Sequence, residues 1–151
     1  MAEQRATRDE FVFFHPLRVR WSELDPQGIV FNPNYFVYAD IAMSEYLRAV
    51  SFVYPEAFAR HGVDTFAVRA EASFVGSAVY DDVLELGARV EQLGRTSFRL
   101  LIAMFRGDAL LTEIRMTYVN ASLETKKPLP LSDEFVSKVE AYERTAPARK
   151  Q

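Results

Sequence analysis

The residues of this chain best suited to chemistry lie in a short turn about 25 residues from its start. Asp25 precedes Pro26, which biases Asp25 toward an extended backbone, and Gly28 lets the chain turn back sharply where a positive φ is required. A long apolar helical pattern follows, so Asp25 would face the unpaired N–H groups and the partial positive charge of a helix N-terminus. This arrangement pairs a nucleophile or general base with an electrophilic anion site. An ordinary solvated Asp in a turn is the alternative.

The start of that helix is predicted from two neighbouring residues. Asn32 is a suitable N-cap, and Pro33 suits the first helical position because its missing N–H would have had no partner there. Apolar residues then recur at helical spacing, namely Tyr35, Ala39, Ala42, Met43, Tyr46, Leu47 and Val50. Phe36, Val37 and Ile41 lie off this stripe, so we expect the helix to be buried on most sides.

Segments of alternating polarity predict strands on either side of this helix. They are residues 17–21, 68–74, 84–91, 98–105 and 110–119, of which 98–105 is apolar on both faces, as in a central strand. Short turns separate the last three, which predicts an antiparallel meander. Short helical segments are predicted at 56–60 and 135–143. One long apolar helix among about five strands predicts an α+β fold in which a curved antiparallel sheet wraps around the helix.

Composition limits the class of protein. The chain has 151 residues, 49% of them hydrophobic, which suits one globular domain. Its net charge of -3 argues against a nucleic-acid partner, and it has no apolar run long enough to span a membrane. Without cysteine or a recognisable signal peptide, we expect a cytoplasmic protein. We predict a flexible arm at 1–10, a single domain at 11–145 and a frayed tail at 146–151.

Several other chemistries lack the residues that they need. The chain contains neither a Gly-x-Ser-x-Gly elbow nor a glycine-rich phosphate loop. With no cysteine and no histidine pair at ligand spacing, no metal site is expected. His15 and His61 lie in a pre-proline position and beside a turn glycine, which indicates structural or exposed roles.

Two blocks of sequence resemble one enzyme family. The string Asp25-Pro-Gln-Gly-Ile-Val-Phe-Asn-Pro-Asn-Tyr35 resembles the active-site segment of hot-dog-fold acyl-CoA thioesterases. It is most similar to the 4-hydroxybenzoyl-CoA thioesterase branch, which carries its carboxylate on the loop before the central helix. Residues 72–75 and 80–84 match the same branch in order and spacing. The resemblance implies the hot-dog fold, dimers that pair again into homotetramers, and active sites between subunits.

The resemblance also implies roles for single residues. Asp25 would attack the thioester carbonyl carbon to form a mixed anhydride, or would activate the attacking water as a general base. The Asn32 backbone N–H would polarise the carbonyl oxygen. Gly28 and Tyr35 belong to the same substrate-binding segment.

For the acyl group, the resemblance implies contacts from a second subunit. Asp40 matches the position that contacts the phenolic hydroxyl of an aroyl group, which favours an aromatic acyl group bearing a donor. An unpaired carboxylate in this apolar part of the helix would be costly, so an Arg or Tyr partner across the dimer is the alternative. Ser73 and Phe74 lie on the strand that matches the acyl pocket.

For the coenzyme A end, this chain departs from the family pattern. The branch carries a basic run in the turn after the third strand, where this chain has Gly94-Arg95-Thr96, so only Arg95 remains to bind phosphate there. Lys126 and Lys127 could compensate. No cofactor is expected, since coenzyme A is part of the substrate.

Three alternatives to this reading stay open. Another hot-dog branch has its catalytic acid on the central helix, which makes Glu45 a rival to Asp25, although Arg48 lies near it in sequence. Short- or medium-chain aliphatic acyl-CoA is a second substrate class. A module that binds acyl thioesters without hydrolysing them is the third alternative.

Overall fold

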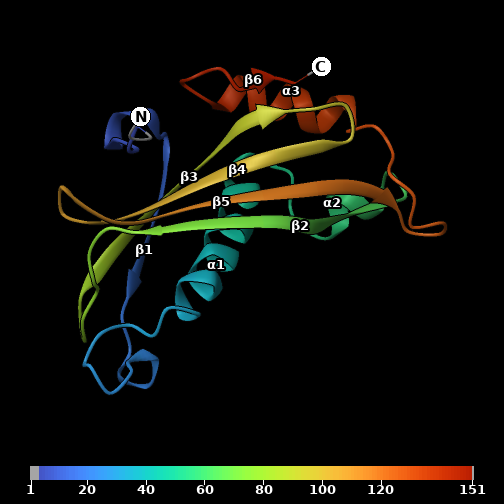
Figure 1. Cartoon of the computed structure of the whole chain (residues 1–151). Helices are drawn as coiled ribbons and strands as arrows, with labels where there is room; N and C mark the ends of the chain where they lie inside the picture. The colour runs from blue at the N-terminus through green and yellow to red at the C-terminus, as the bar shows by residue number, and fades with distance from the viewer. Residues whose placement is uncertain (1–3, 151) are drawn as a thin grey trace.

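In the computed structural model, which describes residues 4–150, a curved antiparallel sheet wraps around one long helix, α1 (Asn34–Ala49) (Figure 1). The sheet order is β1-β3-β4-β5-β2, with β1 (Phe13–Arg18), β2 (Val63–Phe74), β3 (Val83–Leu93), β4 (Ser97–Arg106) and β5 (Ala109–Ser122). Shorter elements are η1 (Arg8–Glu10), η2 (Trp21–Glu23), α2 (Glu56–Ala59), α3 (Asp133–Tyr142) and β6 (Ala148–Arg149). The predicted α+β fold and the β3-β4-β5 meander are confirmed. None of the helices in residues 4–150 is long and apolar enough to cross a membrane.

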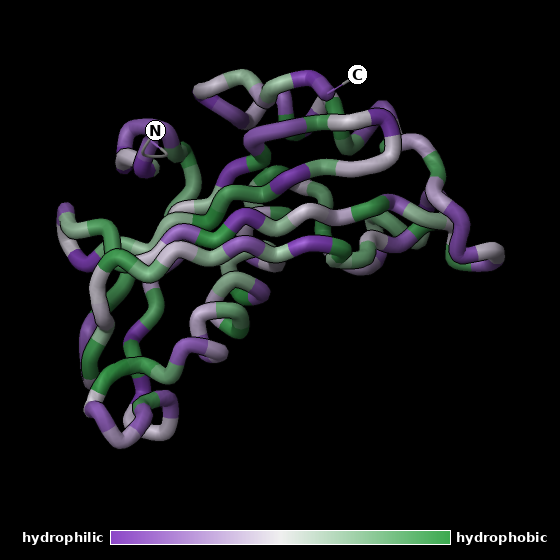
Figure 2. Tube along the Cα trace, in the orientation of Figure 1, coloured by the Kyte–Doolittle hydropathy of each residue, from purple (hydrophilic) through white to green (hydrophobic). Residues whose placement is uncertain are grey.

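Strand β4 is central, as predicted, and different segments cover its two faces. Leu100, Ile102 and Met104 belong to the main core around α1. The intervening residues Leu101, Ala103 and Phe105 form a second cluster with Ala6 and Phe11 from the N-terminal segment. On the neighbouring strand, a Cβ at position 87 would lie 3.1 Å from the Phe11 ring, so the glycine there makes room for this ring. On other strands of the sheet, hydrophilic and hydrophobic residues alternate (Figure 2).

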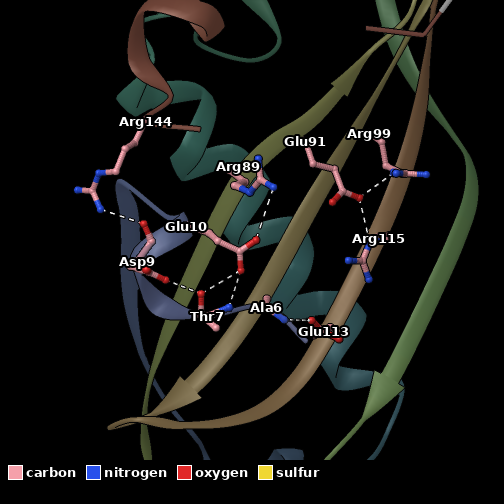
Figure 3. A network of polar contacts seen from close by, with 10 residues as sticks. All are labelled: Ala6, Thr7, Asp9, Glu10, Arg89, Glu91, Arg99, Glu113, Arg115 and Arg144. Atoms are coloured by element: carbon pink, nitrogen blue, oxygen red, sulfur yellow. Dashed lines mark hydrogen bonds and ion pairs between the residues drawn. The ribbon is translucent and has the colours of Figure 1, made fainter. Parts of the chain in front are cut away.

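Charged side chains occupy the face of the sheet turned away from α1, and the N-terminal segment lies across them (Figure 3). The Ala6 N–H donates to Glu113 (2.5 Å). Glu91 accepts hydrogen bonds from Arg99 (2.7 Å) and Arg115 (2.9 Å) on the two neighbouring strands. Buried charges are costly unless they are paired and hydrogen-bonded, and this network provides the partners.

Both ends of the described chain make contacts that the sequence did not predict. In the segment predicted as a flexible arm, Ala6 is 6% exposed and Thr7 forms a capping box with Glu10. In the segment predicted as a frayed tail, Ala148–Arg149 pairs in parallel with β3. Residues 1–3 and 151 lie outside the described part. Neither segment has an apolar run that would predict these contacts, which are made by one small side chain, by charged side chains such as Arg5 and Arg8, and by backbone hydrogen bonds.

Helix α1 begins later than predicted. Its first residue is Asn34, so the prediction of Asn32 as N-cap and Pro33 as first helical residue is wrong. The N–H groups of residues 34, 35 and 36 donate to the carbonyl oxygens three residues earlier (2.8, 3.1 and 3.1 Å). This tight turn meets the need that a capping side chain would otherwise meet. The first strand is also displaced, since it covers residues 13–18 rather than 17–21.

The expected burial of α1 on most sides is wrong for the single chain. Residues of one stripe, including Tyr38, Ala42 and Tyr46, have no exposed surface. On another face, Phe36 is 36% exposed, Val37 is 48% exposed and Asp40 is also exposed. The apolar pattern of the helix therefore exceeds what one copy of the sheet covers.

A buried carboxylate joins the end of α3 to α1. Glu143, 8% exposed, accepts a hydrogen bond from the Tyr46 hydroxyl (2.5 Å). Burial raises the pKa of Glu143 to about 7, against the lowering effects of the Tyr46 and Val90 hydrogen bonds and the charge of Arg89. Since the folded state binds this proton more tightly, the associated stability is fully present below the ordinary pKa of 4.5 and is lost as the pH rises to about 7.

We predict that Glu143→Gln removes this pH dependence, because glutamine keeps an acceptor oxygen for Tyr46 but does not titrate. Between pH 4.5 and 7, the free energy of unfolding of the wild type should fall by about 2 kcal/mol relative to the variant. Urea unfolding across this range is the measurement. Glu140→Gln on α3 is the control and should follow the wild type. Parallel profiles for the wild type and Glu143→Gln would contradict the buried proton.

Candidate active site

Asp25 lies in a tight hairpin between η2 and α1. The segment between β1 and α1 lies at one end of the sheet (Figure 1). The Asp25 N–H donates to the Ile29 carbonyl, and the Gly28 N–H donates to the Asp25 carbonyl, both at 2.9 Å. Gly28 has a φ of +76°, and no heavy atom lies within 4 Å of where its Cβ would be. The glycine is therefore required by the left-handed backbone and not by crowding, as the sequence indicated.

The hairpin presents one oxygen of the Asp25 carboxylate. Oδ1 accepts a hydrogen bond from the Gln27 N–H (2.8 Å), which fixes the side chain. Within residues 4–150, Oδ2 has no hydrogen-bond donor, and this leaves it available to a substrate. A half-buried carboxylate that is oriented in this way and still accessible can act as a nucleophile or a general base.

A cavity of about 590 Å³ adjoins Asp25, within the size range of small-molecule sites. Its lining comprises Trp21, Leu24, Asp25, Pro26, Gly28, Val79 and Tyr80. The Trp21 and Tyr80 rings meet edge to face with centroids 5.4 Å apart, and they are 75% and 53% exposed. From the sequence, Trp21 was expected in a strand, and Tyr80 belonged to the block 80–84 that resembles the family, without a role for its side chain. Their large exposed rings next to the carboxylate make both candidate substrate contacts.

Glu23 is the residue that attaches the hairpin to the rest of the fold. Its carboxylate is buried and accepts hydrogen bonds from Arg20 Nη2 (2.8 Å), the Arg20 N–H (2.7 Å) and the Tyr38 hydroxyl on α1 (2.9 Å). Its carbonyl oxygen accepts from the Phe31 N–H (2.9 Å) and from Asn34 Nδ2 (2.8 Å). Glu23 therefore ties the start of the hairpin to its end and to two turns of α1.

The charge of Glu23 is maintained by these partners. Burial alone would raise the pKa of its carboxyl, but hydrogen bonds from Arg20 and Tyr38 outweigh burial and hold the pKa below its usual range. Burial and the Glu23 carboxylate together raise the pKa of Tyr38, so Tyr38 remains a donor. The network is therefore intact at neutral pH and is lost only as the pH falls through the lowered pKa of Glu23.

Asn32 has the free backbone donor that the resemblance implied. No acceptor for the Asn32 N–H is found in the part of the chain that the structure describes. The amides of the next turn are occupied by carbonyl oxygens, and Pro33 has no N–H. An unpaired N–H just before a helix can donate a hydrogen bond to a developing oxyanion.

Tyr35, Ser73 and Phe74 do not line the Asp25 cavity. Tyr35 is 2% exposed, and its hydroxyl accepts a hydrogen bond from the Ala78 N–H (3.1 Å). Its ring lies 5.6 Å from that of Phe74, which is 46% exposed at the end of β2. Through Ala78, Tyr35 anchors the segment that precedes β3 and carries Val79 and Tyr80.

Asp40 lies in a different cavity, so one chain does not bring Asp25 and Asp40 together. This second cavity measures about 310 Å³ and shares no lining residue with the first. Partial burial raises the pKa of the Asp40 carboxyl above its usual range. No hydrogen-bond or ion-pair partner of Asp40 is found within residues 4–150.

The turn after β3 has basic residues beside it that are distant in sequence. Arg95 is exposed there. A polar cavity of about 260 Å³ includes Gly94 and Ser97 together with Arg69, Arg99 and Lys150. Three cations around one turn are suited to phosphate binding, although Arg69 and Arg99 each also pair with a glutamate. Lys126, suggested as a compensating cation, lies instead 5.9 Å from the centre of the Phe66 ring.

The rival acid–base residues have structural contacts. Glu45 forms an ion pair with Arg48 (3.4 Å) and does not line the Asp25 cavity. His61 contacts Glu134 at 2.8 Å and stacks on Phe52.

Comparisons with known proteins show the family to which the chain belongs. The sequence profile of the Thioesterase superfamily matches residues 27–122. A protein of Aquifex aeolicus (strain VF5) is 33% identical over 96 residues, which cover 64% of this chain and 74% of that protein. The 4-hydroxybenzoyl-CoA thioesterase of Pseudomonas sp. (strain CBS-3) is 35% identical over 83 residues, which cover 54% of this chain and 59% of that enzyme.

Among solved structures, a protein of Pseudomonas aeruginosa has the same fold. Its TM-score is 0.81 at 22% identity, over 95% of this chain and 99% of that one. The family profile covers more than half of the chain, and the chain therefore belongs to the Thioesterase superfamily. This confirms the hot-dog fold and the class of enzyme predicted from the sequence, an acyl-CoA thioesterase.

We predict that Glu23→Gln destabilises the protein by about 2 kcal/mol, because it removes a buried charged acceptor shared by Arg20 and Tyr38. Glu45→Gln is the matched control, since it also breaks an i,i+3 ion pair with an arginine, but a more exposed one. That change should cost less than about 0.5 kcal/mol. Urea unfolding of both variants is the measurement. Equal losses of stability in the two variants would show that the Glu23–Arg20 ion pair contributes no more than an ordinary surface ion pair.

Proposed function

We propose that this protein hydrolyses an aromatic acyl-CoA, such as hydroxybenzoyl- or benzoyl-CoA, to the free acid and coenzyme A. The observation that carries the proposal is the Asp25 carboxylate, which is oriented by Gln27 and adjoins a cavity with one oxygen available. The 35% identity of the chain to a 4-hydroxybenzoyl-CoA thioesterase over 83 residues supports an aromatic acyl group.

In this proposal, Asp25 acts on the thioester carbonyl carbon. As a nucleophile, its oxygen displaces the coenzyme A thiolate and gives a mixed anhydride, which water then hydrolyses to the acid and the regenerated carboxylate. As a general base, it takes a proton from the water that attacks the same carbon. On either route the carbonyl oxygen gains negative charge, which the Asn32 N–H would stabilise. Coenzyme A leaves as a product, and no separate cofactor takes part.

The complete site is proposed to lie between two subunits. Strand β2 is at the edge of the sheet and exposes Phe66 and Val68, and the neighbouring face of α1 exposes Phe36 and Val37. A long apolar edge strand would promote aggregation unless another chain pairs with it. Pairing of two copies along β2 would cover this surface and bring the Asp40 of one copy toward the Asp25 of the other. Dimers of this kind would pair again into a homotetramer.

The coenzyme A phosphates are proposed to bind at the turn after β3. Arg95 is the one basic residue of the turn, and Arg69, Arg99 and Lys150 around the adjoining cavity would supply the missing positive charge.

Thiol release from benzoyl-CoA, 4-hydroxybenzoyl-CoA, phenylacetyl-CoA and hexanoyl-CoA tests the proposed reaction. We expect turnover of an aroyl thioester and a loss of about 100-fold or more in kcat for Asp25→Asn, since asparagine can be neither nucleophile nor base. Asp108→Asn, in the exposed turn between β4 and β5, is the control and should behave as the wild type. Preferential hydrolysis of hexanoyl-CoA would favour the aliphatic alternative. Binding without thiol release would instead support the non-catalytic module.

Mixed dimers test whether the site is shared between subunits. A dimer of one Asp25→Asn subunit and one Asp40→Ala subunit, co-expressed with two affinity tags, would contain one site with both mutations and one with neither. We expect about half of the wild-type kcat with 4-hydroxybenzoyl-CoA, well above either parent variant. A site contained in one subunit predicts only the mean of the two parents.

A further inference from the structure

Residues 31–33 lead into α1 with little packing to hold them. Phe31 is 53% exposed, and Asn32 and Pro33 are exposed as well. Burial of apolar side chains therefore contributes little to the position of this segment, although the Asn32 N–H must lie at a fixed place if it is to stabilise an oxyanion. Hydrogen bonds supply the constraint, and two of them come from Asn34.

Asn34 bonds the chain on both sides of the Phe31 backbone. Its N–H donates to the Phe31 carbonyl oxygen (2.8 Å), and its Nδ2 donates to the Glu23 carbonyl oxygen (2.8 Å). The same Glu23 oxygen accepts from the Phe31 N–H (2.9 Å), which the two lone pairs of a carbonyl oxygen allow. Both backbone groups of Phe31 are thus engaged, one by Asn34 itself and the other through the oxygen that it shares with Asn34.

The bond to the Phe31 carbonyl sets the direction of the Asn32 N–H. The Phe31 carbonyl and the Asn32 N–H belong to one trans peptide unit, in which C=O and N–H point in opposite directions. Since the carbonyl is turned toward the Asn34 N–H at the start of α1, the Asn32 N–H points away from that group. This direction leaves it without an acceptor in the part of the chain that the structure describes.

The side chain of Asn34 is a donor here, which is not the usual role of asparagine at the start of a helix. An asparagine at the N-cap accepts a hydrogen bond from a free N–H of the first turn. The N-cap of α1 is instead Pro33, and the partner of the Asn34 side chain is a carbonyl oxygen, which can only accept. The Nδ2 group is therefore required for this contact, and neither a carboxylate nor a methyl group can replace it.

We propose that Asn34 is a positioning residue for the reaction: it holds the Phe31–Asn32 peptide unit so that the Asn32 N–H meets the thioester carbonyl oxygen as negative charge develops there. The inference rests on the proposed function and adds a residue that touches no reacting atom. An oxyanion donor acts mainly on the transition state, so loss of the Nδ2 bond should slow the chemical step more than it weakens substrate binding.

Single-turnover thiol release from 4-hydroxybenzoyl-CoA tests this role. We expect Asn34→Asp to lower the rate constant about 10- to 100-fold, while the substrate concentration for half-maximal rate changes less than about threefold. Aspartate keeps the shape of the side chain and suits a helix N-terminus, so α1 should still form. Asn34→Ala, which removes the donor without adding a charge, should show a loss of the same size.

Asn120→Ala is the matched control. Asn120 is 2% exposed, its Nδ2 donates to the carbonyl oxygens of Leu129 and Pro130 (both 3.0 Å), and it does not line the Asp25 cavity. Because it loses the same kind of bond from a more buried place, urea unfolding should show at least the loss of stability of Asn34→Ala, with an unchanged single-turnover rate. Equal losses of rate in the two alanine variants would overturn the positioning role.

The carbonyl stretch of the bound thioester separates positioning from stability. Its infrared frequency falls as the carbonyl oxygen accepts a stronger hydrogen bond. With isotope-labelled 4-hydroxybenzoyl-CoA, we expect a lower frequency in Asp25→Asn, which leaves the thioester intact, than in the double variant Asp25→Asn/Asn34→Asp. The double variant Asp25→Asn/Asn120→Ala should keep the lower frequency. Equal frequencies in all three would contradict the inference, whatever their stabilities.

The outcomes for Asn34 and for the proposed function are distinguishable. Hydrolysis by the wild type, with rate and carbonyl frequency unchanged in the Asn34→Asp variants, would overturn the inference and leave the proposed function standing. If the wild type binds the thioester without hydrolysing it, the proposed function falls. A low carbonyl frequency in the wild type that is lost in Asn34→Asp would then still support the positioning role, and equal frequencies would contradict it. A wild type that does not bind the thioester would overturn both.

Discussion

One buried carboxylate determines the position of the hairpin that carries Asp25. Glu23 accepts hydrogen bonds from Arg20 and Tyr38, and its carbonyl oxygen binds the chain again where the hairpin ends. Burial of this charge is favourable only because every partner is present. The orientation of Asp25 and the free N–H of Asn32 both follow, since these residues lie on the segment that Glu23 closes. The loop can therefore be irregular and accessible while remaining fixed relative to α1.

The fold also explains why one chain is insufficient for the proposed chemistry. The sheet covers one stripe of α1 and leaves Phe36, Val37 and Asp40 exposed next to the unpaired edge of β2. Asp25 and Asp40 accordingly line separate cavities. A second copy would cover the apolar surface and complete the site by the same association. Stability of such an assembly and recognition of the acyl group would then depend on one surface.

The parts of the fold that rest on local rules could be predicted from the sequence. Gly28 adopts the positive φ that its position in the turn required, and residues 98–105 form the central strand that their apolar character indicated. The prediction of Asn32 as the N-cap was wrong because backbone carbonyl oxygens accept the hydrogen bonds of the first N–H groups of α1, so no capping side chain is needed. Local sequence preference cannot decide whether a backbone N–H will donate to a side chain or to a carbonyl oxygen when the two acceptors are similar in energy.

The parts of the site that rest on distant contacts could not be predicted in this way. Glu23 appears in the sequence as one acidic residue between Ser22 and Leu24, and its partner Tyr38 follows 15 residues later. Tyr118 and Thr65 come from separate strands and meet Asp40 only in the folded chain. The resemblance pointed to Asp25 and Asp40 because both lie in or close to one short stretch of sequence that resembles the family. The residues that support or surround them leave no such local signal.

A crystal structure of the Asp25→Asn variant with 4-hydroxybenzoyl-CoA would show whether the residue at position 25 acts on the thioester carbonyl. We expect the thioester carbonyl carbon about 3 to 3.5 Å from the side chain at position 25. We also expect the carbonyl oxygen about 3 Å from the Asn32 nitrogen, with the ring directed toward Asp40 of the other subunit. A thioester bound with its carbonyl group away from position 25, or beside Glu45, would rule out this role of Asp25.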